Sequence, residues 1–164
     1  MLTPVMKVFT MLGEGGIIWI LIGVILLFWK QTRRTGAVVL LSLLLCLIFC
    51  NGILKNVVAR PRPCWRNPDL AMLIGIPGDY SFPSGHSASS FAAACCLCFQ
   101  SHRGGAAALF MAAAIAASRM YFYVHYPTDI LAGIVLGILM AFLAEWLMRV
   151  LEKKGVFQWG KVQK

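Results

Sequence analysis

Residues 81–99 read SFPSGHSASSFAAACCLCF, a polar turn followed directly by an apolar segment. Proline and glycine in the turn interrupt helices, and the turn closes on a single histidine, His86. The whole chain is 60% hydrophobic, with a mean hydropathy of +0.78, so this polar stretch contrasts with its surroundings. The stretch therefore indicates a polar site at the head of an apolar helix.

The overall composition indicates an integral membrane protein with one domain, residues 1–164. Only 13% of the residues are charged, about half the share of a typical soluble domain. We predict an all-α, polytopic membrane bundle with five spanning helices and, around residues 2–12, an N-terminal amphipathic or half-inserted helix. The start lacks the pattern of a cleavable signal peptide, so we expect it to be retained. The five apolar runs are 15–29, 36–54, 87–101, 104–124 and 130–148.

The charge distribution predicts how the chain crosses the membrane. The net charge is +9, and the cations lie between the apolar runs. This placement indicates that the positive charges set the orientation in the membrane and contact anionic lipid headgroups, and do not bind nucleic acid. Five spans would place nine of the fifteen Lys and Arg residues on one side, which we predict to be cytoplasmic. Segment 55–85 and the turn at 126–129 would then lie together on the extracytoplasmic face of the cell membrane.

Three stretches on that face carry the residues that suit phosphate chemistry. They read KNVVARPRP at 55–63, PSGH at 83–86 and SRMYFYVHYPTD at 118–129. The guanidinium groups of Arg62 and Arg119 can each bind two phosphate oxygens, and Lys55 adds a point charge. The turn at Ser84 and Gly85 directs backbone N–H groups at an anion, because it precedes a helix.

Two histidines complete the predicted site. His125 and Asp129 are four residues apart and share a face if that stretch is helical. The carboxylate would then fix the imidazole tautomer and leave the other ring nitrogen as a nucleophile, while His86 protonates the leaving oxygen. These residues predict a phosphohydrolase that uses a phosphohistidine and needs neither a metal nor another cofactor.

The three stretches together resemble the signature of the type 2 phosphatidic acid phosphatase superfamily, KxxxxxxRP, PSGH and SRxxxxxHxxxD, without a gap or substitution across residues 55–129. The resemblance implies a six-helix core, with the N-terminal amphipathic helix as the sixth, and a membrane-embedded site at the outer leaflet. It implies that His125 is the nucleophile, His86 the acid and base, and Asp129 the partner of His125. The phosphate-binding residues that it implies are Lys55, Arg62, Ser84, Gly85 and Arg119.

The substrate class remains open between several lipid phosphates. The short outward segment favours a polyprenyl diphosphate such as the undecaprenyl carrier, and phosphatidylglycerophosphate, phosphatidate and lipid A are the alternatives. A non-catalytic lipid-binding or transport protein is a remote alternative, because it would be expected to have lost His86, His125 or Asp129. The expected partners are the lipid substrate and the bilayer, without nucleic acid, and the oligomeric state stays open.

Other polar and sulfur-containing residues have more ordinary interpretations. Glu14 could be the partner of a catalytic cation, but we expect it to cap the first helix. Arg60 could bind a headgroup or anchor the chain at the interface. The six cysteines lack zinc-ligand spacing and are interpreted as small packing residues. They are Cys46, Cys50, Cys64, Cys95, Cys96 and Cys98.

Overall fold

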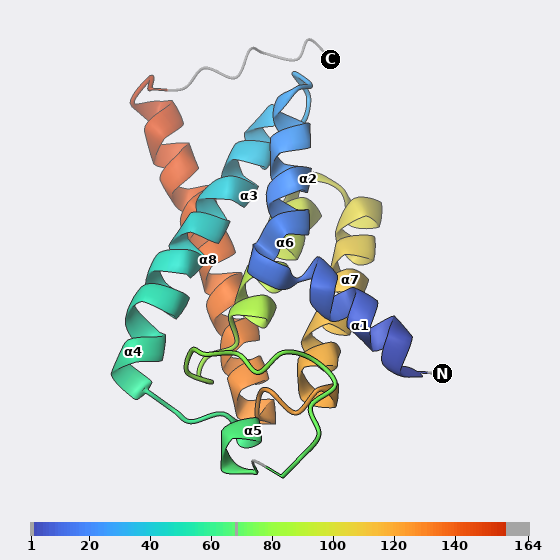
Figure 1. The fold of residues 1–164 in the computed structure, drawn as a ribbon. Coiled ribbons are helices and arrows are strands. Elements are labelled where there is room, and N and C mark those ends of the chain that lie inside the picture. The colour runs from blue at the N-terminus through green and yellow to red at the C-terminus, as the bar shows by residue number, and fades with distance from the viewer. Residues whose placement is uncertain (1, 68, 157–164) are drawn as a thin grey trace.

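The computed structural model describes residues 2–67 and 69–156, and within these residues the regular secondary structure is entirely helical (Figure 1). The predicted all-α bundle is therefore confirmed. The elements are α1 (Leu2–Leu12), the 3₁₀ turn η1 (Glu14–Gly16), α2 (Ile17–Leu27), α3 (Arg33–Cys46), the π-helix η2 (Leu47–Leu54), α4 (Lys55–Val58), α5 (Pro63–Arg66), α6 (Gly85–Gln100), α7 (His102–Tyr121) and α8 (Pro127–Lys153).

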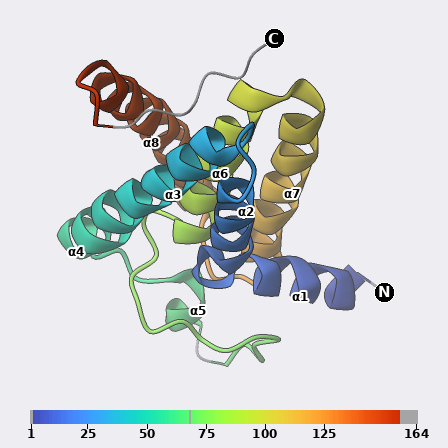
Figure 2. The same cartoon turned by 90° about the horizontal axis from the view of Figure 1, so that it is seen from above.

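The long helices run alongside one another, and α1 lies across them (Figures 1 and 2). The α2–α3 and α6–α7 connections lie at one end of the bundle, and segment 59–84 and the α7–α8 turn lie at the other. All the stretches singled out in the sequence belong to that second end or to the helix ends beside it. We call it the site end.

Helix α6 is the centre of the bundle and packs against α3, α7 and α8. Its buried face consists largely of alanine and serine, and α8 presents glycines to it, which lets two membrane helices approach closely. A Cβ atom on Gly133 would lie 2.6 Å from the carbonyl oxygen of Ser84. Trp19 of α2 is 1% exposed and donates a 2.9 Å hydrogen bond to Ser90 of α6.

Three helical stretches have the length and apolar composition to cross a membrane, namely 33–66, His102–Tyr121 and Pro127–Lys153. The pair of α1 and α2 would be a fourth if it forms one span despite its 45° bend. Helix α6 has 16 residues and α2 has 11, both below the roughly 20 residues that a spanning helix needs. The chain is a multi-pass membrane protein, and the number of five spans stays a prediction.

Two helix ends near the site differ from the apolar runs of the sequence. The run at 36–54 continues through η2 into α4, so Lys55 lies on a helix that extends from the bundle and not in a connection. The N-terminal helix ends at Leu12, because Gly15 (φ +57°) and Gly16 (φ +70°) adopt left-handed conformations that glycine tolerates. This break turns the chain from α1 into α2 above the site.

A charged cluster closes the opposite end of the bundle. Arg34 at the start of α3 donates to Glu145 at 2.9 Å and to Glu152 at 2.8 Å, both on α8. Arg149 donates to Glu145 at 2.8 Å. These ion pairs connect α3 to α8 far from the three motif stretches.

Candidate active site

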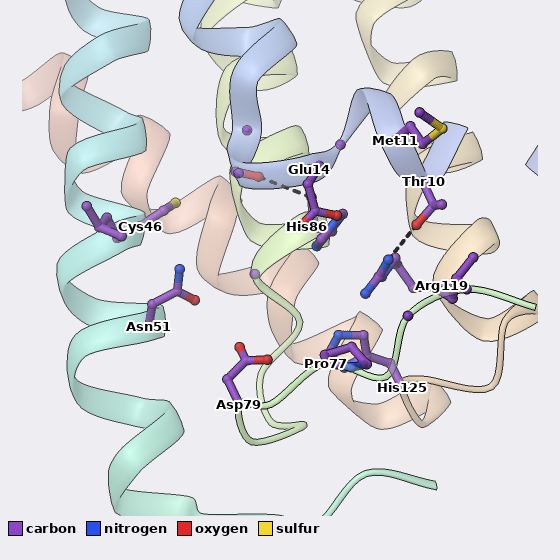
Figure 3. Close-up of a pocket in the computed structure, with 18 of the residues that line it drawn as sticks. Thr10, Met11, Glu14, Cys46, Asn51, Pro77, Asp79, His86, Arg119 and His125 are labelled. Atoms are coloured by element: carbon purple, nitrogen blue, oxygen red, sulfur yellow. Dashed lines mark hydrogen bonds and ion pairs between the residues drawn. The ribbon is translucent and has the colours of Figure 1, made fainter. Parts of the chain in front are cut away.

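A cavity of about 1100 Å³ opens at the site end, and the three motif stretches meet in it (Figure 3). Helix α3 and η2 form one wall, α1 and η1 form a second, and the end of α7 forms a third. Segment 72–79 also lines the cavity. Six of the eight predicted site residues line it directly, and they are Lys55, Arg62, Gly85, His86, Arg119 and His125.

The three predicted phosphate-binding cations are buried beside this cavity. Lys55 is 7% exposed, Arg62 is 2% exposed and Arg119 is 4% exposed. Arg62 donates to the backbone carbonyl oxygens of Asp79 at 2.7 Å and Val124 at 2.8 Å, which fix its guanidinium between two loops. Buried charges are costly unless an anion or a hydrogen-bond acceptor compensates them, so this cluster is suited to an anionic ligand.

His125 lies between the cations and Asp129. Its Nε2 atom is 3.1 Å from Nη1 of Arg62, and its Nδ1 atom is 3.6 Å from Oδ2 of Asp129. The condition that this stretch be helical is not met, because α7 ends at Tyr121 and α8 begins at Pro127. The turn between the helices nevertheless directs Nδ1 at the carboxylate and leaves Nε2 on the side of the cations.

Asp129 holds several parts of the site together. It occupies the third position of α8, where its Oδ2 accepts from the backbone N–H of Tyr126 at 3.0 Å and from the Ser81 hydroxyl. Its Oδ1 accepts from Arg60 at 2.7 Å. A carboxylate with these donors is fully buried and ionised, and it can orient the His125 ring through Nδ1.

The pH dependence of turnover should reflect the burial of His125. Burial and, to a smaller extent, the charges of Arg62 and Arg119 lower the pKa of His125, Asp129 opposes them, and the resulting pKa is about 4. The neutral, nucleophilic imidazole therefore persists down to about pH 4 and is lost below it. We expect the acidic limb of kcat/KM near pH 4, and a limb near the ordinary histidine pKa of about 6.5 would contradict this. Comparing a monoester with a diphosphate separates the titration of the substrate from that of the enzyme.

Of the turn residues, Gly85 lines the cavity and Ser84 does not. The N–H of Ser84 donates to the carbonyl oxygen of Asp129 at 3.0 Å, and its hydroxyl accepts from Ser87 as the N-cap of α6. Ser84 thus builds the start of the helix, while Gly85 brings the positive end of α6 to the cavity. A Cβ on Gly85 would lie 2.9 Å from Oδ1 of Asn51, so a larger residue here would displace the Asn51 side chain.

The second histidine faces the N-terminal part of the chain. Nε2 of His86 is buried, has no hydrogen-bond partner among the described residues, and lies 3.6 Å from Oε2 of Glu14. Glu14 thus lies beside His86, a residue of the site, and its two interpretations from the sequence stay predictions. One helical turn earlier, Thr10 accepts a hydrogen bond from Arg119.

Asp79 is a site residue that the sequence analysis did not select. Its carboxylate pairs with Lys55 and, at 2.6 Å, with Arg62. Burial raises the pKa of Asp79, but Lys55 and Arg62 outweigh it and hold the value at about 2. Near neutral pH, the ionised carboxylate of Asp79 therefore pairs with two of the cations that the motifs predict to bind phosphate.

Replacing Asp79 with asparagine should strengthen phosphate binding, because it removes the anion that competes for Lys55 and Arg62. We expect the inhibition constant of inorganic phosphate to fall by about fivefold, as ~1 kcal/mol for a partly exposed pair implies. Asp69→Asn removes an exposed charge from the same segment and is the matched control. An unchanged or higher constant would mean that Asp79 supports the anion site and does not compete with phosphate.

Arg60 and Ser81 also lie at the site, although Arg60 is a variable position of the first motif and Ser81 lies outside all three motifs. Arg60 pairs with Asp129, donates to Thr128 at 2.7 Å and lies 3.9 Å over the ring of Tyr126. Ser81 is buried and lies 3.4 Å from Nδ1 of His125. These contacts join segment 59–84 to the start of α8, which the sequence alone could not place together.

Fold and cavity define a helical membrane protein with a buried cationic site next to two histidines. The chain belongs to the PAP2 superfamily, whose family model matches residues 35–153, so the resemblance carried by the motifs is confirmed. The chain is 33% identical over 129 residues to an undecaprenyl-diphosphatase of Sulfolobus acidocaldarius, a match that covers 77% of this chain and 62% of that protein. The chain therefore spans less than two thirds of this relative.

Two solved structures share the fold. Aquifex aeolicus LpxE has a TM-score of 0.77 and 25% identity, with 88% of this chain and 86% of that chain covered. A PAP2 type phosphatidylglycerolphosphate phosphatase from Bacillus subtilis has a TM-score of 0.72 and 29% identity, with 91% of this chain and 77% of that chain covered. The names of these similar proteins thus refer to different lipid substrates.

Proposed function

We propose that this protein is a metal-independent lipid phosphatase that removes the terminal phosphate of a lipid diphosphate. One observation carries the proposal. A single cavity joins the cations and histidines to an apolar wall formed by α2, α3 and η2. A water-soluble phosphate ester has no apolar group to place against such a wall. A lipid phosphate would place its phosphate beside the cations and histidines and its lipid chain against the apolar wall. The apolar wall consists of Ile20, Leu40, Leu43, Leu44 and Leu47.

The proposed reaction has two steps. Nε2 of His125 attacks the phosphorus, the bond to the bridging oxygen breaks, and the leaving group takes a proton from His86. Water then attacks the phosphohistidine, His86 accepts a proton from that water, and inorganic phosphate and neutral His125 are released. Lys55, Arg62 and Arg119 balance the charge on the phosphoryl oxygens throughout.

The proposed substrate class is a polyprenyl diphosphate, and the name of the similar undecaprenyl-diphosphatase supports it. A second phosphate also suits an additional cation, since Lys7 of α1 lines the same cavity. The alternative is a glycerolipid phosphate, which the name of the B. subtilis structure favours. We propose that the site faces the extracytoplasmic side of the cell membrane, following the cation count of the connections.

The experiment is phosphate release by the detergent-purified protein in the presence of EDTA. Undecaprenyl diphosphate, phosphatidylglycerophosphate and phosphatidate are assayed side by side, with His125→Ala as the inactive control. We expect EDTA-resistant release that is fastest with the diphosphate. Release that EDTA abolishes would exclude the metal-independent reaction, and a faster rate with either glycerolipid would select the alternative substrate. No release by folded protein would overturn the proposal.

A further inference from the structure

The turn between α1 and α2 places a carboxylate against His86, outside the three motifs. Figure 3 shows Glu14 directly beside the His86 ring, with Oε2 3.6 Å from Nε2. Gly13 packs on the same ring, since a Cβ atom there would lie 2.9 Å from Cδ2 of His86. The backbone of this turn therefore approaches the imidazole closely enough to fix its position.

His86 otherwise faces an excess of positive charge. A proton on His86 is opposed by the cations that bind the phosphate, and Asp79, the other carboxylate among the residues that line the cavity, is engaged by Lys55 and Arg62. Glu14 is the carboxylate that remains for His86. Besides Glu14, the charged and titratable groups that line the cavity around His86 are Lys7, Cys46, Lys55, Arg62, Asp79, Arg119 and His125.

We propose that Glu14 is the positioning residue of His86, and that it orients this imidazole and stabilises its protonated form for proton transfer to the leaving oxygen. The assignment of the proton transfer rests on the proposed function, but the pairing itself does not. A carboxylate close to an imidazole stabilises its protonated form and raises its pKa. Burial, Arg119 and the other nearby positive charges lower the pKa of His86 to about 3, and the carboxylate of Glu14 is positioned to oppose this effect.

The position of Glu14 is itself fixed by contacts with the site. Thr10, one helical turn before Glu14, accepts a hydrogen bond from Arg119, which is 4% exposed. Helix α1 and η1 therefore contact one phosphate-binding cation and one catalytic histidine. The carboxylate of Glu14 is 71% exposed toward the cavity, so a substitution there removes charge without opening a hole in the core.

The test is a direct titration of His86 by NMR of Cε1-labelled histidine in native protein and Glu14→Gln. The chain has three histidines, so His86→Gln assigns the signal, and exposed His102 is an internal reference. We expect the midpoint of His86 to fall by about one pH unit in Glu14→Gln. Glu14→Asp should recover part of that shift. Asp69→Asn, with the same loss of charge outside the cavity lining, should leave it unchanged.

An equal midpoint for His86 in native protein and Glu14→Gln would overturn the inference. The pH profile of kcat provides the second readout. A lower pKa of His86 in Glu14→Gln should move the alkaline limb of this profile to lower pH by the same amount. A limb that stays in place while His86 shifts would also overturn the positioning role. A native protein that releases no phosphate would instead remove the proposed function, and the titration would still report on Glu14.

Discussion

Replacement of His125 with alanine should lower phosphate release by a factor on the order of a thousand or more, because the substitution removes the proposed nucleophile. Nε2 lies 3.1 Å from Arg62, so an attacking nitrogen there meets a phosphoryl group that the guanidinium holds. The measurement is the initial rate of phosphate release, compared with His102→Ala. His102 is exposed at the start of α7, and its loss should leave the rate unchanged.

Trapping the intermediate separates a lost nucleophile from a damaged site. Native protein quenched during turnover with a labelled substrate should carry phosphate that is stable in base and labile in acid, as phosphohistidine chemistry requires. His125→Ala should carry none. Label of this kind on His125→Ala would show that another residue attacks, and His125 would then have to serve a different role.

Removal of Arg62 should have the next largest effect. We expect Arg62→Ala to lower kcat by about a hundredfold to a thousandfold, the usual cost of losing one donor to a developing oxyanion, ~2.7–4 kcal/mol. Arg62→Lys should recover little of this loss. An ammonium group cannot reach the carbonyl oxygens of Asp79 and Val124 and also the phosphate in the fixed directions of a guanidinium.

The control for Arg62 must separate catalysis from folding, since the side chain is 2% exposed and supports two loops. Arg66→Ala removes an exposed cation from the same connection and should keep both the rate and the thermal unfolding midpoint. If Arg62→Ala unfolds at a much lower temperature, the rate of Arg62→Lys becomes the informative one. Native-like turnover in Arg62→Lys with native stability would contradict the phosphate-binding role.

Much of the fold could be predicted because apolar runs and spacing are local properties. Each of the five apolar runs is largely helical, and six of the eight residues selected from the three motif stretches line one cavity. The predicted role of Ser84 is less direct, because its N–H is taken by the carbonyl oxygen of Asp129, a contact between segments 45 residues apart in the sequence. Such pairings depend on how α6 packs against α8.

The particular contacts of Asp79 and Glu14 could not be predicted for the same reason. An acidic residue in a polar connection is ordinarily solvated. Nothing in the sequence close to Asp79 or Glu14 shows which side chain its carboxylate contacts. Asp79 reaches Lys55 across 24 positions and Glu14 reaches His86 across 72. Only the packing of α1 and of segment 67–84 against the bundle decides these contacts.

Asp129 has structural contacts that could keep it in the sequence after catalysis is lost. Its carboxylate accepts from the backbone N–H of Tyr126 just before α8, from Ser81 and from Arg60, in addition to facing His125. A descendant that had abandoned catalysis and become a pseudoenzyme would still need this anchor to fold. Retention of Asp129 in a genome survey is thus a poor indicator of surviving turnover. Arg119, a buried cation that donates to Thr10 and pairs with no carboxylate among the described residues, is a better indicator.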